Sequence, residues 1–128
     1  MAKTTYVDGF VLVVPKDKVA EYKKMARMGM KAWLRHGALS YRECMGDDLT
    51  PAAPPGMKHL QFPQMAKAGK DETVWFSYIE FKSKKHRDQV NAKVMQEMDA
   101  EMAKHKDMSM PFDMKRFAYG GFTVEVGS

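Results

Sequence analysis

The sequence predicts an α+β protein of the ferredoxin-like type, in which a four-stranded antiparallel sheet carries two helices on one face in the order βαββαβ. Two observations predict it: four segments have the residue pattern of strands and two have the spacing of helices. The 128 residues suit a single domain, 1–128. No stretch resembles a membrane span or a signal peptide, so we expect a cytoplasmic protein.

The predicted strands differ in how their apolar residues are distributed. Tyr6–Pro15 and Glu72–Phe81 are apolar at consecutive positions, which is typical of strands that are covered on both faces. In the first of them, Val7, Val11 and Val13 share one face. The other two strands are predicted at Ala38–Met45 and Lys115–Val126, the last with Gly120 and Gly121 marking a bulge or a close approach.

Helical spacing predicts a first helix over Lys16–His36, ended by Gly37. A second helix begins after Ser83 and runs to about His105. Between the second and third strands, residues 47–70 contain four of the six prolines and predict a long loop, a lid or an arm rather than a packed element. Within it, Lys58–Phe62 is a candidate edge strand.

Two helices cover only one face of a four-stranded sheet, yet both faces of the first and third strands are apolar. An apolar face of that size is rarely left in water. We therefore expect a second copy of the chain to pack against it, sheet to sheet, so that the protein is a homodimer.

Four segments, taken in order, closely resemble the bacterial family DUF1428, also called YbaA-like. They are YVDGFVLVVPKDK, WLRHGALSYRECMGDD, HRDQVNAKVM and MPFDMKRFAYGGF, and the resemblance covers nearly the whole chain. It implies the dimeric α/β-barrel superfamily, in which ferredoxin-like subunits pair through their sheets. Members of that superfamily include cofactor-free and haem-degrading monooxygenases and small stress-response proteins, activities that carry over only as fold-level analogy.

A pocket is expected between the sheet and the helices or at the mouth of the barrel. Aromatic walls with a few carboxylates suit a small, mostly apolar ligand. The candidate ligand-binding residues are Trp33, Tyr6, Asp8, Tyr41, Glu43, Trp75, Tyr78 and Tyr119.

Two strand carboxylates, Asp8 and Glu43, lie among apolar neighbours and need an explanation. Glu43 is either held by a cation, with Arg116 or Arg87 as the candidate, or is unpaired and available as a base or a protonated donor. A neighbouring pattern points to a second arrangement: Arg87 and Asn91 share one helix face and could fix a carboxylate such as Asp113.

Known catalytic and metal-binding motifs are missing from the sequence. There is no nucleophile elbow, phosphate-binding loop or dinucleotide fingerprint, and we expect no cofactor. Glu43 and Cys44 point to opposite faces of a strand and cannot share a metal ion, so no metal site is predicted. Cys44 is expected to be a buried, inert thiol. The candidate catalytic residues are His36, Glu43 and Tyr41.

Three functions remain open. The first is a homodimer that binds a small apolar or aromatic molecule. The second is a cofactor-independent monooxygenase-type enzyme, in which Trp33, His36 or Tyr41 orients the substrate and a carboxylate or histidine takes a proton. The third, RNA binding, shares the βαββαβ order and the aromatic sheet face. It is disfavoured because the Lys/Arg-Gly start of the RNA-recognition motif is missing and because the strand Glu72–Phe81 is too apolar for a solvated platform. The net charge of +5 is too modest to require a nucleic acid, and we expect neither a nucleic acid nor a membrane as partner.

Overall fold

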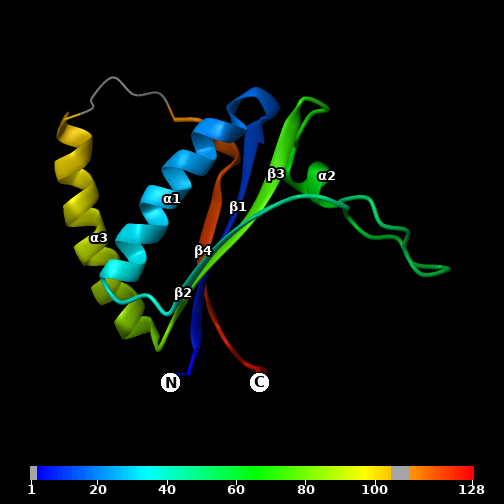
Figure 1. Cartoon of the computed structure of the whole chain (residues 1–128). Coiled ribbons are helices and arrows are strands. Elements are labelled where there is room, and N and C mark those ends of the chain that lie inside the picture. The colour runs from blue at the N-terminus through cyan, green and yellow to red at the C-terminus, as the bar shows by residue number, and fades with distance from the viewer. Residues whose placement is uncertain (1–2, 105–109) are drawn as a thin grey trace.

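The computed structural model describes residues 3–104 and 110–128, except for the side chains of residues 102–104. It confirms the predicted fold class, with a four-stranded antiparallel sheet in the order β2-β3-β1-β4. The strands are β1 (Tyr6–Pro15), β2 (Ser40–Met45), β3 (Glu72–Phe81) and β4 (Ala118–Thr123). Figure 1 shows the sheet with the two long helices on one side of it.

The two central strands have the predicted bounds, whereas the two edge strands are shorter than predicted. Before β2, the chain after the first helix turns through Gly37, which adopts a φ of 111° that favours glycine. Before β4, residues Met114–Arg116 form a 3-10 turn. Gly121 is a close approach as predicted, because a Cβ there would collide with the side chain of Tyr6.

The helices α1 (Val19–Arg35) and α3 (Lys84–Lys104) cover one face of the sheet (Figure 1). A 3-10 turn, Lys16–Lys18, precedes α1, and the predicted end of α3 at His105 lies outside the described residues. The core between the helices and the sheet forms two clusters. One contains Ala32 of α1 with Val90 and Val94 of α3, and the other contains Tyr22 and Ala26 of α1. The buried strand residues of these two clusters are Leu12, Val14, Trp75, Ile79 and Phe81.

The opposite face of the sheet is partly covered by a short helix that the sequence did not predict. This helix, α2 (Phe62–Ala66), begins at Gln61 with a capping box and buries Ala66 against Val13 and Val74. The prediction that residues 47–70 hold no packed element is therefore wrong for α2. The candidate edge strand Lys58–Phe62 is also wrong, since Lys58–Gln61 have no regular structure.

The rest of this second face, which we call the open face, is covered by none of the described helices. It carries Val7, Val11, Arg42, Cys44, Phe76, Tyr78, Glu80 and Phe122, as the strand register shows. Phe76 is 48% exposed and Phe122 is 62% exposed. Cys44 is exposed rather than buried, because it lies on this face of an edge strand. None of the helices in the described part of the chain has the length and apolarity to cross a bilayer.

Candidate functional site

Glu43 lies on β2 and points from the sheet towards α1, where three hydroxyl groups surround its carboxylate. The hydroxyl of Tyr22 donates to Oε1 at 2.7 Å, and the hydroxyl of Tyr41 donates to Oε2 at 2.6 Å. Ser77 on β3 also donates to Oε1. Within residues 3–104 and 110–128, no Lys, Arg or His forms an ion pair with Glu43. We call Glu43 and its three donors the hydroxyl cluster.

The two tyrosines of the hydroxyl cluster are held in their protonated form. Burial raises the pKa of both phenols well above the ordinary value of 10, and the negative charge of Glu43 raises it further. Tyr22 and Tyr41 therefore remain hydrogen-bond donors across the physiological range. The same two rings also pack in the core, with Tyr22 against Trp75 and Tyr41 against Trp33.

The hydroxyl cluster forms one wall of a cavity of about 180 Å³ between the sheet and the two long helices. The other walls are almost wholly apolar and include Phe10, Leu12, Met25, Trp33, Ile79, Met98, Phe112 and Phe117. An apolar cavity with one convergent polar group is the usual form of a small-molecule site.

A second, more open cleft of about 370 Å³ lies on the other side of Glu43. Glu43, Tyr41 and Ala26 line both spaces. The cleft adds two cations of α1, Lys23 and Arg27, whose side chains are in an exposed part of that helix. Glu43 thus separates an inner apolar cavity from an outer basic cleft.

Gly29 allows α1 to lie close to the hydroxyl cluster. It is buried in the middle of α1, where glycine costs roughly 0.5–1 kcal/mol relative to alanine. A Cβ at this position would lie 3.1 Å from the hydroxyl oxygen of Tyr41 and 3.5 Å from the ring of Trp33. The glycine leaves room for the Tyr41 hydroxyl that binds Glu43.

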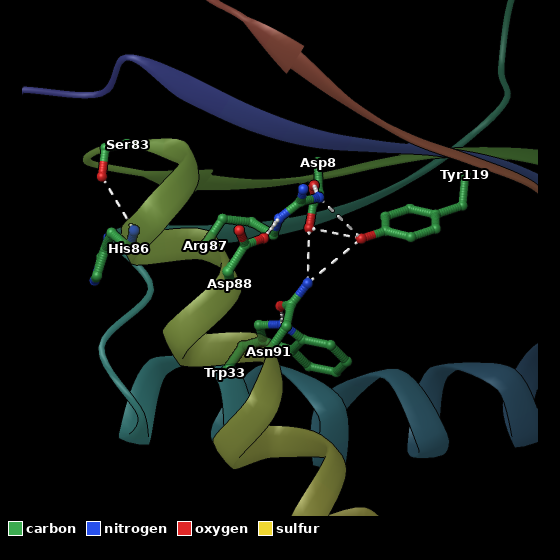
Figure 2. A network of polar contacts seen from close by, with 8 residues as sticks. All are labelled: Asp8, Trp33, Ser83, His86, Arg87, Asp88, Asn91 and Tyr119. Atoms are coloured by element: carbon green, nitrogen blue, oxygen red, sulfur yellow. Dashed lines mark hydrogen bonds and ion pairs between the residues drawn. The ribbon is translucent and has the colours of Figure 1, made fainter.

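The second predicted carboxylate, Asp8, lies in a different environment (Figure 2). It is 1% exposed, and Arg87 donates from Nη1 to its Oδ1 at 2.7 Å. Asn91 Nδ2 and the hydroxyl of Tyr119 both donate to Oδ2 at 3.2 Å. Trp33 Nε1 donates to Asn91 Oδ1 at 2.9 Å and so fixes the amide. We call these residues the Asp8 network.

The Asp8 network connects four elements of the fold. Asp8 comes from β1, Tyr119 from β4, the Arg87 and Asn91 pair from α3, and Trp33 from α1. The prediction that Arg87 and Asn91 act together on a carboxylate is confirmed, but the carboxylate is Asp8 and not Asp113. Asp113 instead accepts from Arg116 Nε at 2.7 Å.

The predicted cation partner of Glu43 is wrong for both candidates. Arg87 is bound to Asp8, and Arg116 makes a two-pronged ion pair with Glu72 at 2.6 and 2.7 Å. The hydrogen bonds from Arg116 and from the backbone N–H of Gly69 lower the pKa of Glu72 to about 2. Among the described residues, the groups that hydrogen-bond to Glu43 are the hydroxyls of Tyr22, Tyr41 and Ser77.

The predicted ligand-binding residues fall into four groups. Trp33, Tyr41 and Glu43 line the inner cavity, and Trp75 lines the outer cleft. Tyr6, Asp8 and Tyr119 are associated with the Asp8 network, where the guanidinium of Arg87 lies 5.0 Å from the Tyr6 ring centre. Tyr78 lies on the open face, opposite all the others.

Of the candidate catalytic residues, Tyr41 and Glu43 are in contact and His36 is remote from them. His36 ends α1, 3.5 Å from Glu97, and lines neither space. Sequence reasoning missed Tyr22 and Ser77. Tyr22 has the helical spacing of the residues that α1 buries, which also include Ala26 and Gly29. Ser77 is a polar residue amid an apolar strand, which is a signal for a buried hydrogen bond. In the described part of the chain, no three His, Cys, Asp or Glu residues group as metal ligands.

The fold and the site define a ferredoxin-like α+β protein with an apolar cavity that ends on a hydroxyl-bound carboxylate. The chain belongs to the DUF1428 family, described as "Protein of unknown function", whose model matches residues 5–114. It is 43% identical to "Uncharacterized protein YbaA" of Escherichia coli K12 over 117 residues. These aligned residues make up 91% of this chain and 93% of the relative. YbaA of Shigella flexneri matches to the same extent.

Proposed function

We propose that this protein binds a small, mostly apolar molecule, with an aromatic ring in the inner cavity and a hydrogen-bond donor directed at Glu43. The observation that carries the proposal is a carboxylate without a cation partner, in the described residues, at the wall of an otherwise apolar cavity. Buried or half-buried carboxylates are usually paired with cations, and exceptions concentrate at functional sites.

The size and polarity of the cavity limit the class of ligand. A cavity of about 180 Å³ suits one ring, since an apolar cavity of about 150 Å³ in another protein binds benzene. A carboxylate offers about four acceptor positions, and the hydroxyl cluster occupies two on Oε1 and one on Oε2. The remaining position on Oε2 suits a phenolic hydroxyl, an alcohol or an amine.

Binding to the inner cavity is tested with phenol as the probe and the two indole N–H groups as reporters. Trp33 lines the cavity, whereas Trp75 lines the outer cleft and donates to Thr73 at 2.9 Å. In a titration of ¹⁵N-labelled protein, phenol is expected to shift the Trp33 indole signal in a saturable way and to leave that of Trp75 nearly unchanged. Absence of a saturable Trp33 shift at 10–20 mM phenol contradicts the proposal.

A second candidate function is a cofactor-independent oxygenase-type enzyme. The observation that favours it is the direct contact of Glu43 with Tyr41 in an apolar, water-poor space, where a carboxylate can accept a proton from an acidic O–H or C–H of a bound ring. The resulting substrate anion would then react with oxygen directly. The test measures oxygen uptake in the presence of hydroquinones. Uptake by the wild type that is abolished in Glu43→Gln supports this reaction, and uptake no faster than in buffer alone rules out this candidate function.

We also propose that the protein acts as a homodimer formed through the open face, in the manner of a dimeric α/β barrel. Its exposed aromatic residues Phe76 and Phe122, with the partly buried Val11 between them, form a surface that water solvates poorly. Among the residues that define this face, Arg42 is the one cation, which gives no cationic track for a nucleic-acid backbone. Sedimentation equilibrium should give a dimer for the wild type and a monomer for Phe76→Lys.

A further inference from the structure

The chain between β2 and α2 forms an arm that projects from the open-face side of the sheet (Figure 1). We define the arm as residues 50–61. Its first end is anchored, because Gly46 N–H donates to Val74 C=O at 2.7 Å and Leu49 packs against the cluster of Val13 and Ala66. Its second end enters α2 directly. Both ends are therefore fixed to the face that the helices α1 and α3 leave uncovered.

The tip of the arm has a defined conformation although it contacts little else. Pro54 C=O accepts from Met57 N–H at 3.0 Å, Pro55 follows, and Gly56 has a φ of 80°. These features make a type II turn, which favours proline and then glycine at its two central positions. Prolines also reduce the conformational freedom that is lost when a segment becomes ordered. The arm is thus preorganised for a contact that the monomer does not supply.

Apolar side chains of the arm and of α2 are exposed in the single chain. In the arm, Met57 is 63% exposed and Leu60 is 69% exposed. In α2, the side chains of Phe62 and Met65 are exposed as well. The backbone of the arm and of α2 lies on the side of the sheet opposite to α1 and α3, which is the side of the open face (Figure 1). Arm and open face together form a larger apolar surface than either alone, and such surfaces mark interaction sites.

The charges of the open face do not oppose a contact between two copies. Arg42 and Glu80 are opposite in sign, so a two-fold contact through this face brings no excess of one charge together. The position of α2 sets the direction of packing, because it stands on the end of the face near Val13 and Val74. Two such helices cannot occupy the same end of the interface. The two sheets must therefore pack with their α2 ends apart.

This packing directs each arm over the far end of the partner's sheet. At that end of the open face lie Val7 and the register partner of Val7, Phe122. The Phe122 ring lies against the sheet over Gly9, where a Cβ would be 3.1 Å from the ring. A flat, exposed aromatic surface is therefore present where the apolar tip of a partner's arm would lie.

We propose that the arm is a clasp that binds a second copy of this chain, with Met57 and Leu60 packing at the Phe122 end of the partner's open face. The inference rests on the homodimer proposed above and adds a second contact surface to it. The clasp also explains why exposed apolar residues follow a preorganised turn.

The test compares the dimer dissociation constant of five proteins by sedimentation equilibrium. The arm variant is Met57→Ser combined with Leu60→Ser, and its matched control is Lys58→Ser combined with His59→Ser, which alters the two exposed polar residues in between. The arm variant is expected to weaken dimerisation at least tenfold at an unchanged melting temperature of the monomer, whereas the control should stay within threefold. The wild type, Phe122→Ala and the combination of Phe122→Ala with the arm variant complete a double-mutant cycle, in which the effects of the two changes should not add.

The thiol of Cys44 gives an independent test of dimerisation, because it is exposed on the open face and is the single cysteine of the chain. At one protein concentration, its reaction with a thiol reagent should be slow in the wild type and faster in the arm variant. If the wild type is a dimer and the arm variant has the same dissociation constant, the clasp is wrong and the dimer through the open face still holds. A wild-type monomer overturns both, and binding of oligo(U) by that monomer would assign the open face to RNA.

Discussion

Two carboxylates, Asp8 and Glu43, project from the same face of the sheet but lie in different environments. Asp8 is fully buried, is neutralised by Arg87 and lines neither of the two spaces. Glu43 is half-buried, is held by three hydroxyls and lines both. The first arrangement neutralises a charge and connects four elements, and the second keeps a charge at the wall of an apolar cavity.

The difference separates a structural role from a functional one. An ion pair such as that of Asp8 and Arg87 contributes little net free energy, yet it is costly to break, because the remaining charge stays buried. A carboxylate without a cation partner depends on dipoles that a ligand can supplement. Natural proteins commonly give up stability at such positions in return for function.

The largest expected effect is on the stability of the Asp8 network. Asp8→Asn removes the buried one of the two carboxylates that pair with the guanidinium of Arg87, the other being Asp88 at 2.8 Å. Breaking a buried pair costs about 3–5 kcal/mol, and because Asp88 remains we expect a loss of about 3 kcal/mol. Glu43→Gln leaves no cation unpaired, so its free energy of unfolding should remain within about 1 kcal/mol of the wild type. Urea unfolding at pH 7 measures both. Equal losses in the two variants would remove the distinction between the carboxylates.

The next effect is a loss of stability in alkaline solution. The folded-state pKa values of Tyr22 and Tyr41 lie above the ordinary 10, so their stabilisation is complete below pH 10 and is lost as the pH rises above it. At one pH unit above 10, two such tyrosines together lose about 2–3 kcal/mol.

Tyr22→Phe isolates this effect, because it removes one of the two titrating groups and keeps the ring. The difference in unfolding free energy between pH 8 and pH 11 should be smaller in the variant by about 1 kcal/mol. The lysines, which also titrate in this range, are common to both proteins. An identical alkaline loss in wild type and variant would show that Tyr22 ionises as freely as a solvated phenol.

A smaller effect concerns the ion pair of Glu72 and Arg116, a more exposed counterpart of the Asp8 network. Because the folded-state pKa of Glu72 is lowered to about 2, its contribution is complete above its ordinary pKa of 4.5 and is lost as the pH falls towards 2. Glu72→Gln should cost roughly 1 kcal/mol at pH 7, as expected for a partly exposed pair. Near pH 2 the two proteins should unfold with nearly equal free energies, and a constant difference across this range would contradict the pairing.

Much of the fold followed from apolar patterning. The central strands were predicted with their bounds because they are apolar on both faces, and this pattern also predicted that the face without α1 and α3 would be apolar. The helix α2 was missed because five residues in a proline-rich segment do not display a helical period. Its formation depends on the burial of Ala66, which is a tertiary effect.

The site was predicted in part, and the errors have simple geometric causes. Tyr78 follows Trp75 by three residues on one strand, so strand alternation already excluded a shared face. The proposed partner Arg116 precedes β4, which lies at the opposite sheet edge from Glu43 on β2. The hydroxyls of Tyr22 and Ser77 come from other elements, and only the packed fold brings them to Glu43.

The central claim, that Glu43 recognises a donor on a ring in the inner cavity, is tested by comparing phenol with toluene. The two rings have similar size, and only phenol donates a hydrogen bond. Dissociation constants from the Trp33 indole titration should favour phenol at least tenfold in the wild type, since a hydrogen bond to a charged group contributes about 1.5–3 kcal/mol. In Glu43→Gln the preference should fall to threefold or less. A wild type that binds toluene as tightly as phenol, or a Gln variant that retains the full preference, would contradict the account.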